Sequence, residues 1–417
     1  MSILIRDALV DGRPQDVYVE EDRIAAIGRR QEADVVIDGR EKACLPGLVN
    51  GHTHAAMTLL RSYADDMNLQ DWLERRIWPL EAKFRPEDVY WGTKLACLEM
   101  IRSGTTTFND MYFFMEEAAR AVGDMGLRAV LSYGMIDHFD ERKAEAELKA
   151  TEGFLRFVRN LRNPRVQAAV GPHAMSMVSG ATLTAARGLA VDEGVKVHFH
   201  LAETERDVEA SRERYGKGPV RALNEMGFLG DWLVAAHCVW IGDRDARILG
   251  ERGVRAIHNP TSNMKLGVGR AFPYPALRAA GVTMGLGTDG AASNDNLDMF
   301  EEVKLASLLQ KFATREPTLL PAGEAWKMAT EGGADALDLP TGRLEEGKLA
   351  DLILIDLRNP QLVPRHNLTS LVAYAANGSV VDTVICDGRV LMRGGHVEGE
   401  AEILEQAEKR AQGLKEK

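Results

Sequence analysis

The chain has 417 residues, of which 45% are hydrophobic and 27% charged, so it is long enough to bury a large core. Its formal net charge of −11 argues against a nucleic-acid-binding surface, because such a surface needs clustered positive charge. The acidic balance does not by itself indicate a substrate.

The N-terminus and the cysteines indicate a cytoplasmic protein. The first residues, MSILIRDALVDGR, contain charges and lack the long apolar core of a signal peptide. No uncharged apolar run approaches the ~18 residues that a membrane span needs. Cys44, Cys97, Cys238 and Cys386 lie far apart without a CxxC pair, which is typical of reduced thiols.

Both ends of the chain contain short β-like runs. Residues 1–45 include SILIRDALV, DVYVEEDRIAAIG and ADVVIDG, and the C-terminal part repeats the style in ADLILIDL and VDTVICDGRVLM. These runs are rich in Val and Ile and are separated by glycines, as strands of a small sheet should be. We therefore expect a composite β-sandwich domain built from residues 1–45 and 345–417.

The centre, residues 46–344, alternates short apolar strands with long amphipathic helices, which predicts a (β/α)8 TIM barrel. A doubly wound open sheet is the competitor, but no GxGxxG follows the first strand. The expected strands are the run ending in LPGLV, then TTTFND, RAVLSYGM, VQAAVGPH, VKVHFHLAE, LVAAHCV, RAIHNP and TMGLGTDG.

Polar residues gather at the ends of these strands, which is the face where barrels carry their chemistry. Seven histidines fall there: His52, His54, His173, His198, His200, His237 and His258. His52 and His54 are two residues apart, so on an extended segment both side chains point to one side. With His200 and Asp289 they form a set of three nitrogens and one oxygen that suits Zn2+, and Fe2+ or Mn2+ accept the same ligands.

Two further predictions concern the neighbours of this ligand set. His198 and His200 share a face of their strand, and we prefer His200 as the ligand because it lies at the strand tip, whereas His198 lies deeper. Glu203 follows closely enough to take a proton from a water that the metal activates. Its alternative role is that of an ordinary carboxylate at a helix N-terminus.

Two roles remain open for His237. It could be a further metal ligand, or it could polarise the attacked centre or the bound water. Binuclear sites of this kind need a bridging residue, often a modified lysine, on the fourth strand. That strand ends in GPH here, so we expect one metal ion per subunit.

Four segments of the chain are distinctive together: PGLVNGHTH, HFHLAET, AAHCV and GLGTDGAASN. Through these segments the chain resembles the amidohydrolase superfamily. It is strongest to the branch of deaminases acting on S-adenosylhomocysteine, 5'-methylthioadenosine and 5'-deoxyadenosine, through LLRSYADDMNLQDWLERRIWPLEAKF, HNPTSNMKLGVG and LEEGKLADLILIDL. The resemblance covers nearly the whole chain. It implies a metal-dependent deaminase of adenosine-type nucleosides, which we expect to be a cytoplasmic homo-oligomer.

The resemblance also implies roles for particular residues. Glu203 would pass a proton to a purine ring nitrogen, His237 would stabilise the arriving oxygen, and Asp289 would deliver a proton to the departing ammonia. Glu81 would accept hydrogen bonds from the ribose hydroxyls, and His173 would lie near the sugar or the 5' group. Without the resemblance, Glu81 is better explained as a helix-surface carboxylate and His173 as a structural residue at a strand end.

Two departures bear on the substrate. The branch usually has GPHAPY or GPHSPY after the fourth strand, whereas this chain has GPHAMS, which changes the lining beside His173. The family also tends to carry an arginine for the homocysteine carboxylate, and the candidates here are Arg142 and Lys143. If neither reaches the site, shorter substrates such as 5'-deoxyadenosine or methylthioadenosine are favoured.

Two other functions remain open from the sequence. The first is another mononuclear amidohydrolase, such as a guanine, cytosine or s-triazine aminohydrolase or chlorohydrolase. The second is a non-catalytic structural homologue, which would be expected to have lost metal ligands that this chain retains.

Overall fold

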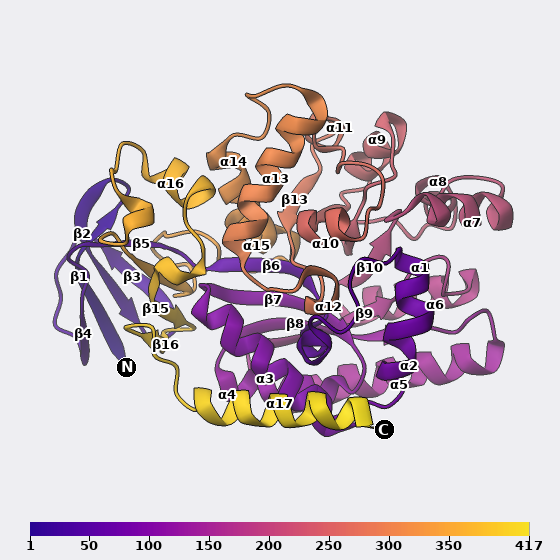
Figure 1. The fold of residues 1–417 in the computed structure, drawn as a ribbon, viewed down its shortest axis with the longest axis horizontal. Helices are drawn as coiled ribbons and strands as arrows, with labels where there is room; N and C mark the ends of the chain where they lie inside the picture. Colours follow the sequence, from indigo (N-terminus) through magenta and orange to yellow (C-terminus); the bar gives the residue numbers. More distant parts are fainter. Residues whose placement is uncertain (417) are drawn as a thin grey trace.

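The computed structural model describes residues 1–416 and contains two 8-stranded sheets (Figure 1). One sheet forms a parallel barrel in which the strands follow one another in chain order. The barrel strands are β6 (Leu48–Thr53), β7 (Thr105–Tyr112), β8 (Arg128–Met135), β9 (Val166–Pro172), β10 (Val197–Leu201), β11 (Leu233–His237), β12 (Arg255–His258) and β13 (Thr283–Leu286). Each overlaps a run that the sequence predicted, with β6 and β7 extending beyond the predicted ends to Thr53 and Tyr112, so the barrel is confirmed.

The first and last barrel strands meet along a seam held by hydrogen bonds. The backbone N–H of Asp289 donates to the carbonyl of His52 at 3.0 Å, and the N–H of Thr288 donates to Asn50 Oδ1 at 3.0 Å. Gly287 makes this approach possible, because a Cβ there would lie 2.8 Å from the backbone nitrogen of His52. The seam therefore joins the start and the end of the barrel beside the predicted metal ligands.

Helices surround the barrel and occupy its loops (Figure 1). The main ones are α3 (Pro86–Arg102), α4 (Met115–Met125), α5 (Glu141–Leu161), α6 (Gly180–Glu193), α7 (Glu205–Tyr215), α8 (Pro219–Glu225), α9 (Asp243–Glu251), α11 (Tyr274–Ala279), α13 (Met299–Thr314) and α14 (Ala322–Lys327). Shorter ones are η1 (Ala55–Leu60), α1 (Leu69–Trp72), the π-turn η2 (Leu73–Ile77), α2 (Trp78–Glu81), α10 (Pro260–Lys265), α12 (Ala291–Asn294), the π-turn η3 (Met328–Gly332) and α15 (Gly333–Ala336). None of the helices in residues 1–416 is long and apolar enough to cross a membrane.

The second sheet is built from both ends of the chain, as predicted. Its N-terminal strands are β1 (Ser2–Val10), β2 (Arg13–Glu20), β3 (Arg23–Ile27), β4 (Val35–Asp38) and β5 (Lys42–Pro46). Its C-terminal strands are β14 (Leu352–Asp356), β15 (Val381–Cys386) and β16 (Arg389–Arg393). Antiparallel pairing of β5 with β14 joins the two groups. One face buries a cluster that includes Ile5, Val19 and Leu354.

Ion pairs and helix packing attach this sheet and the C-terminus to the barrel. Buried Arg128 of β8 forms ion pairs with Asp351 at 2.9 Å and with Asp387 at 2.8 Å. The segment after β14 contains η4 (Pro360–Leu362), α16 (Leu368–Tyr374) and η5 (Gly378–Val380), and the final helix α17 (Glu400–Glu416) lies along α3 (Figure 1). The domain boundaries at 45/46 and 344/345 remain a prediction.

Candidate metal centre and active site

The predicted ligands converge at the carboxyl end of the barrel. His52 belongs to β6, His54 follows that strand, His200 belongs to β10, and Asp289 follows β13. His52 Nε2 and His54 Nε2 each lie 3.3 Å from Asp289 Oδ1, and His200 Nε2 lies 3.3 Å from His54 Nε2. Ligand atoms of His52, His54 and His200 lie within 4.8 Å of one another, as do those of His52, His237 and Asp289.

This group fits a divalent metal ion. His52 Nε2 is buried and has no hydrogen-bond partner among the described residues, although burying a polar atom unpaired is costly. Three imidazole nitrogens and one carboxylate oxygen are a donor set that transition metals accept. A bound cation would satisfy this nitrogen and separate the acidic and imidazole groups that now crowd together.

Outer hydrogen bonds orient several of these ligands. His54 Nδ1 lies 2.6 Å from the carbonyl of Met111, and His200 Nδ1 lies 2.8 Å from the carbonyl of His173. Because a carbonyl only accepts, both Nδ1 atoms carry hydrogen and both Nε2 atoms present lone pairs to the centre. Ser262 and Ser293 donate to the other carboxylate oxygen of Asp289 at 2.7 and 3.1 Å. Such contacts to the far side of a ligand are typical of metal sites.

The backbone is strained at the points where it presents these groups. His237 and Asp289 have φ values of 70° and 61°, and Ala202, between His200 and Glu203, has φ 49°. Left-handed conformations are uncommon for residues other than glycine, and they concentrate at functional sites. Each turn redirects the chain as it leaves the barrel, so the side chain faces the cavity.

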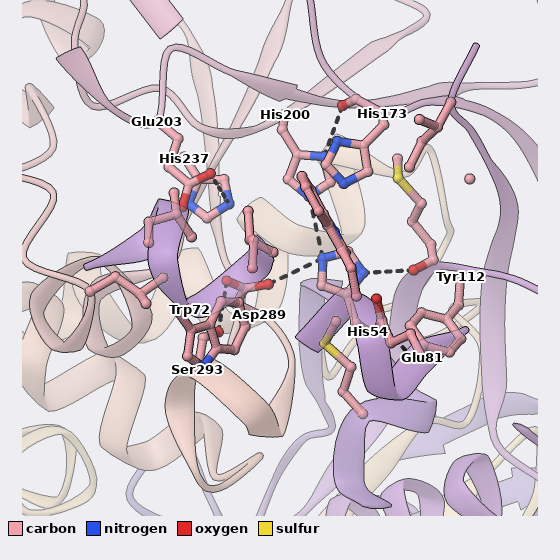
Figure 2. Close-up of a pocket in the computed structure, with 18 of the residues that line it drawn as sticks. His54, Trp72, Glu81, Tyr112, His173, His200, Glu203, His237, Asp289 and Ser293 are labelled. Carbon is pink, nitrogen blue, oxygen red and sulfur yellow. Dashed lines mark hydrogen bonds and ion pairs between the residues drawn. The ribbon is translucent and has the colours of Figure 1, made fainter. Parts of the chain in front are cut away.

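Glu203 and His237 form a pair on one side of this cavity (Figure 2). Their nearest atoms, His237 Nε2 and Glu203 Oε2, are 3.8 Å apart. Burial raises the pKa of Glu203 to about 7. Burial lowers the pKa of His237, but the carboxylates of Glu203 and Asp289 outweigh this and raise it overall. A carboxyl group with a pKa near neutrality can both take up and release a proton, as proton transfer requires.

Glu81 lies on the opposite side of the cavity, next to Tyr112 (Figure 2). The Tyr112 hydroxyl donates to Glu81 Oε1 at 2.6 Å. Burial raises the pKa of Glu81, while the hydrogen bond from Tyr112 opposes this. The carboxylate is therefore held in the cavity wall and does not lie on an exposed helix surface.

A π-turn brings Glu81 to this position. Leu69, Trp72 and Leu73 share a helix face because they are spaced by three and four residues. Trp78 follows five residues after Leu73, which matches the wider repeat of the π-turn at Leu73–Ile77. Trp78 and Glu81 thus continue the same face, and all five residues line the cavity.

His173 also lines the cavity, where its ring stacks on that of His200 with centroids 4.4 Å apart. Burial lowers the pKa of His173 to about 3, so the ring is neutral. Its Nδ1 is buried without a hydrogen-bond partner among residues 1–416. This nitrogen is available to a ligand or a water molecule.

Comparison with known proteins agrees with this geometry. The sequence model of the Amidohydrolase family matches residues 43–391. The chain belongs to the amidohydrolase family. It is 51% identical over 413 residues to a 5'-deoxyadenosine deaminase of Methanoregula boonei, covering 97% of this chain and 93% of the relative.

Two further relatives extend the comparison. A 5-methylthioadenosine/S-adenosylhomocysteine deaminase of Thermococcus sibiricus is 48% identical over 400 residues, with 94% of each chain covered. The crystal structure of an adenosine deaminase from Xanthomonas campestris with bound zinc superposes with a TM-score of 0.93 at 33% identity, covering 100% of this chain and 98% of that one. The resemblance found in the sequence is therefore confirmed.

Arg142 and Lys143 of this amidohydrolase do not line the cavity. They begin α5, where their backbone N–H groups donate to Asp140 Oδ1 at 2.9 and 3.0 Å. Within residues 1–416 the cavity lining contains no arginine or lysine. Its apolar part consists of Met57, Leu69, Trp72, Leu73, Trp78, Met111, Phe113, Ile136 and Leu266.

Sequence reasoning missed several supporting residues of the amidohydrolase site. Tyr112, which orients Glu81, ends β7 and could have been noted as one more polar residue at a strand end. Asn263 Oδ1 lies 2.9 Å from His237 Nδ1 and fixes that ring. Ser262 and Ser293, which hold Asp289, carry no distinctive spacing, because they come from two separate short helices, α10 and α12, that only the fold brings together.

Proposed function

We propose that this amidohydrolase is a metal-dependent hydrolytic deaminase that converts an adenosine-type nucleoside to the inosine analogue and ammonia. The observation that carries the proposal is the Glu203–His237 pair beside the His/Asp ligand group, with the Glu81 carboxylate across the same cavity. The names of the relatives that are about half identical support the same substrate class.

We further propose one metal ion per subunit, held by His52, His54, His200 and Asp289. Zinc is the first choice, since a structure 33% identical contains it, and Fe2+ or Mn2+ suit the same ligands. A metal in this position supplies Lewis acidity, which lowers the pKa of water from 15.7 to about 7.

The proposed reaction replaces the exocyclic amine by oxygen. Glu203 takes a proton from water as the oxygen adds to the ring carbon bearing the amine, and then gives the proton to the adjacent ring nitrogen. His237 donates a hydrogen bond to the arriving oxygen, for which its raised pKa suits it. Asp289 takes the remaining proton from the added oxygen and delivers it to the amine nitrogen as the C–N bond breaks, so that the ring carbonyl forms and ammonia leaves.

The cavity supports a nucleoside with a neutral 5' group. In this proposal Glu81 accepts hydrogen bonds from the ribose hydroxyls, and His173 lies near the sugar or the 5' position. No cation lines the cavity within residues 1–416, so the homocysteine carboxylate would have no partner from this chain. We therefore rank 5'-deoxyadenosine and 5'-methylthioadenosine above S-adenosylhomocysteine. A cytoplasmic location, consistent with four free buried cysteines, and a homo-oligomer remain proposals.

A substrate panel tests the function. Conversion of the adenine to the hypoxanthine spectrum is followed with adenosine, 5'-deoxyadenosine, methylthioadenosine and S-adenosylhomocysteine. Loss of the substrate's own spectrum is followed with guanine, cytosine and an s-triazine as alternatives. We expect turnover of the nucleosides and its loss, with zinc retained, in Glu203→Gln. Turnover of guanine, cytosine or the triazine alone would replace this proposal by the corresponding aminohydrolase or chlorohydrolase.

A further inference from the structure

A chain of hydrogen bonds runs away from the metal centre behind His52. His52 Nδ1 lies 2.7 Å from His198 Nε2, and His198 Nδ1 lies 3.3 Å from Ser132 Oγ. The Ser132 hydroxyl donates to the backbone carbonyl of Asp110 at 2.8 Å. His52, His198, Ser132 and Asp110 are all buried. This chain explains what the deeper histidine of β10 does.

The last group of the chain fixes the direction of every bond in it. The Asp110 carbonyl can only accept, so the Ser132 hydroxyl donates its one hydrogen to that carbonyl. Ser132 Oγ must therefore accept the hydrogen bond from His198 Nδ1–H. A charged His198 would be buried without a carboxylate bonded to it, so this ring is neutral and its Nε2 accepts. His52 therefore donates from Nδ1, and its Nε2 carries the lone pair.

His52 needs this support more than the other two histidine ligands. His54 and His200 each place Nδ1 against a carbonyl, which alone determines the tautomer. The partner of His52 is another imidazole, which can donate or accept, so two more residues are required to settle the direction. His52 Nε2 lies 3.3 Å from Asp289 Oδ1 without the geometry of a hydrogen bond, which agrees with a lone pair directed at the centre.

We propose that His198 and Ser132 are positioning residues that hold His52 in its Nδ1–H tautomer and thereby raise the metal affinity of the site. The proposal rests on the metal site proposed above. Groups that orient a ligand in this way typically change metal affinity by about 10- to 100-fold when removed.

The test measures zinc affinity of apo-protein by competition with a chromophoric chelator, together with its thermal unfolding. His198→Leu is expected to weaken zinc binding about 10- to 100-fold, and Ser132→Ala to weaken it by a smaller factor. His198→Gln should restore most of the affinity, because its amide oxygen can accept from His52 and its NH2 can donate to Ser132. Ser103→Ala and His258→Leu are matched controls, since both residues are buried but take no part in the hydrogen bonds that connect His52 with Asp110.

The outcomes separate the two proposals. If the wild-type protein fails to retain zinc, the proposed metal site itself is refuted. Wild-type protein that binds zinc tightly, with unchanged affinity in both His198→Leu and Ser132→Ala, overturns the positioning role. Should those variants not fold, 15N-histidine-labelled wild-type apo-protein decides: the Nδ1–H form of His52 supports the proposal, and the Nε2–H form refutes it.

Discussion

Replacing Tyr112 by Phe tests whether Glu81 binds the substrate's ribose. The change removes only the hydroxyl that donates to Glu81 at 2.6 Å. A hydrogen bond to a charged acceptor contributes about 2 kcal/mol, which corresponds to a factor of about 30 in an equilibrium constant. We therefore expect KM for 5'-deoxyadenosine to rise about 10- to 30-fold, with a much smaller change in kcat.

The pH dependence of this variant gives a second readout. The hydrogen bond from Tyr112 lowers the pKa of Glu81 against the effect of burial, so its loss raises that pKa further. A neutral Glu81 is a weaker acceptor for ribose hydroxyls, and KM of the variant should therefore increase more steeply than that of the wild type as the pH falls.

The assay is steady-state deamination followed by ultraviolet absorbance across a pH series. Tyr133→Phe is the matched control, because Tyr133 pairs with Tyr112 in the register of β7 and β8 but does not line the cavity. An unchanged KM in Tyr112→Phe at every pH, or an equal rise in Tyr133→Phe, would refute the assignment of Glu81 to the ribose.

Three more predictions address the centre and the scaffold. Because burial raises the pKa of Glu203 to about 7 and its carboxylate form accepts the proton, kcat/KM should fall as the pH drops below that pKa; a flat acid limb would argue against Glu203 as the base. A chelator should abolish activity and one equivalent of zinc should restore it, whereas two tightly bound ions measured by elemental analysis would contradict a mononuclear site. Arg128→Met should lower the free energy of unfolding in urea by about 3–5 kcal/mol, since it leaves Asp351 buried without its ion-pair partner, whereas Asp387 keeps Arg165 at 3.3 Å. Stability equal to wild type would show that this ion pair contributes little.

The barrel was predictable because each strand is a short apolar run bounded by a helix, and its functional residues follow the run directly. His52, His200 and Asp289 could be placed at one face from this rule alone. The two β-rich termini likewise predicted a shared sheet. Seam closure and the pairing of β5 with β14 depend on contacts between distant segments, which periodicity does not report.

The surroundings of the ligands were less accessible from sequence. The spacing of Leu73 and Trp78 does not predict a π-turn. In a regular α-helix, residues five positions apart lie on different faces, so Trp78 would be expected to point away from the face of Leu73. The partnership of Ser132 with His198 joins different strands and depends on side-chain direction inside the barrel. Such details follow from packing, and packing is known only when all the strands are in place.

The seam between β6 and β13 has a consequence for how the protein is made. The proposed metal ligands begin at His52 and end at Asp289, so the ribosome must release nearly the entire barrel before the donor set is complete. A nascent chain that has emerged only through β12 offers histidines but lacks the carboxylate. The proposed donor set is therefore complete only after Asp289 has been synthesised, and with this ligand set the site could select its ion only when nearly the whole barrel is available to fold.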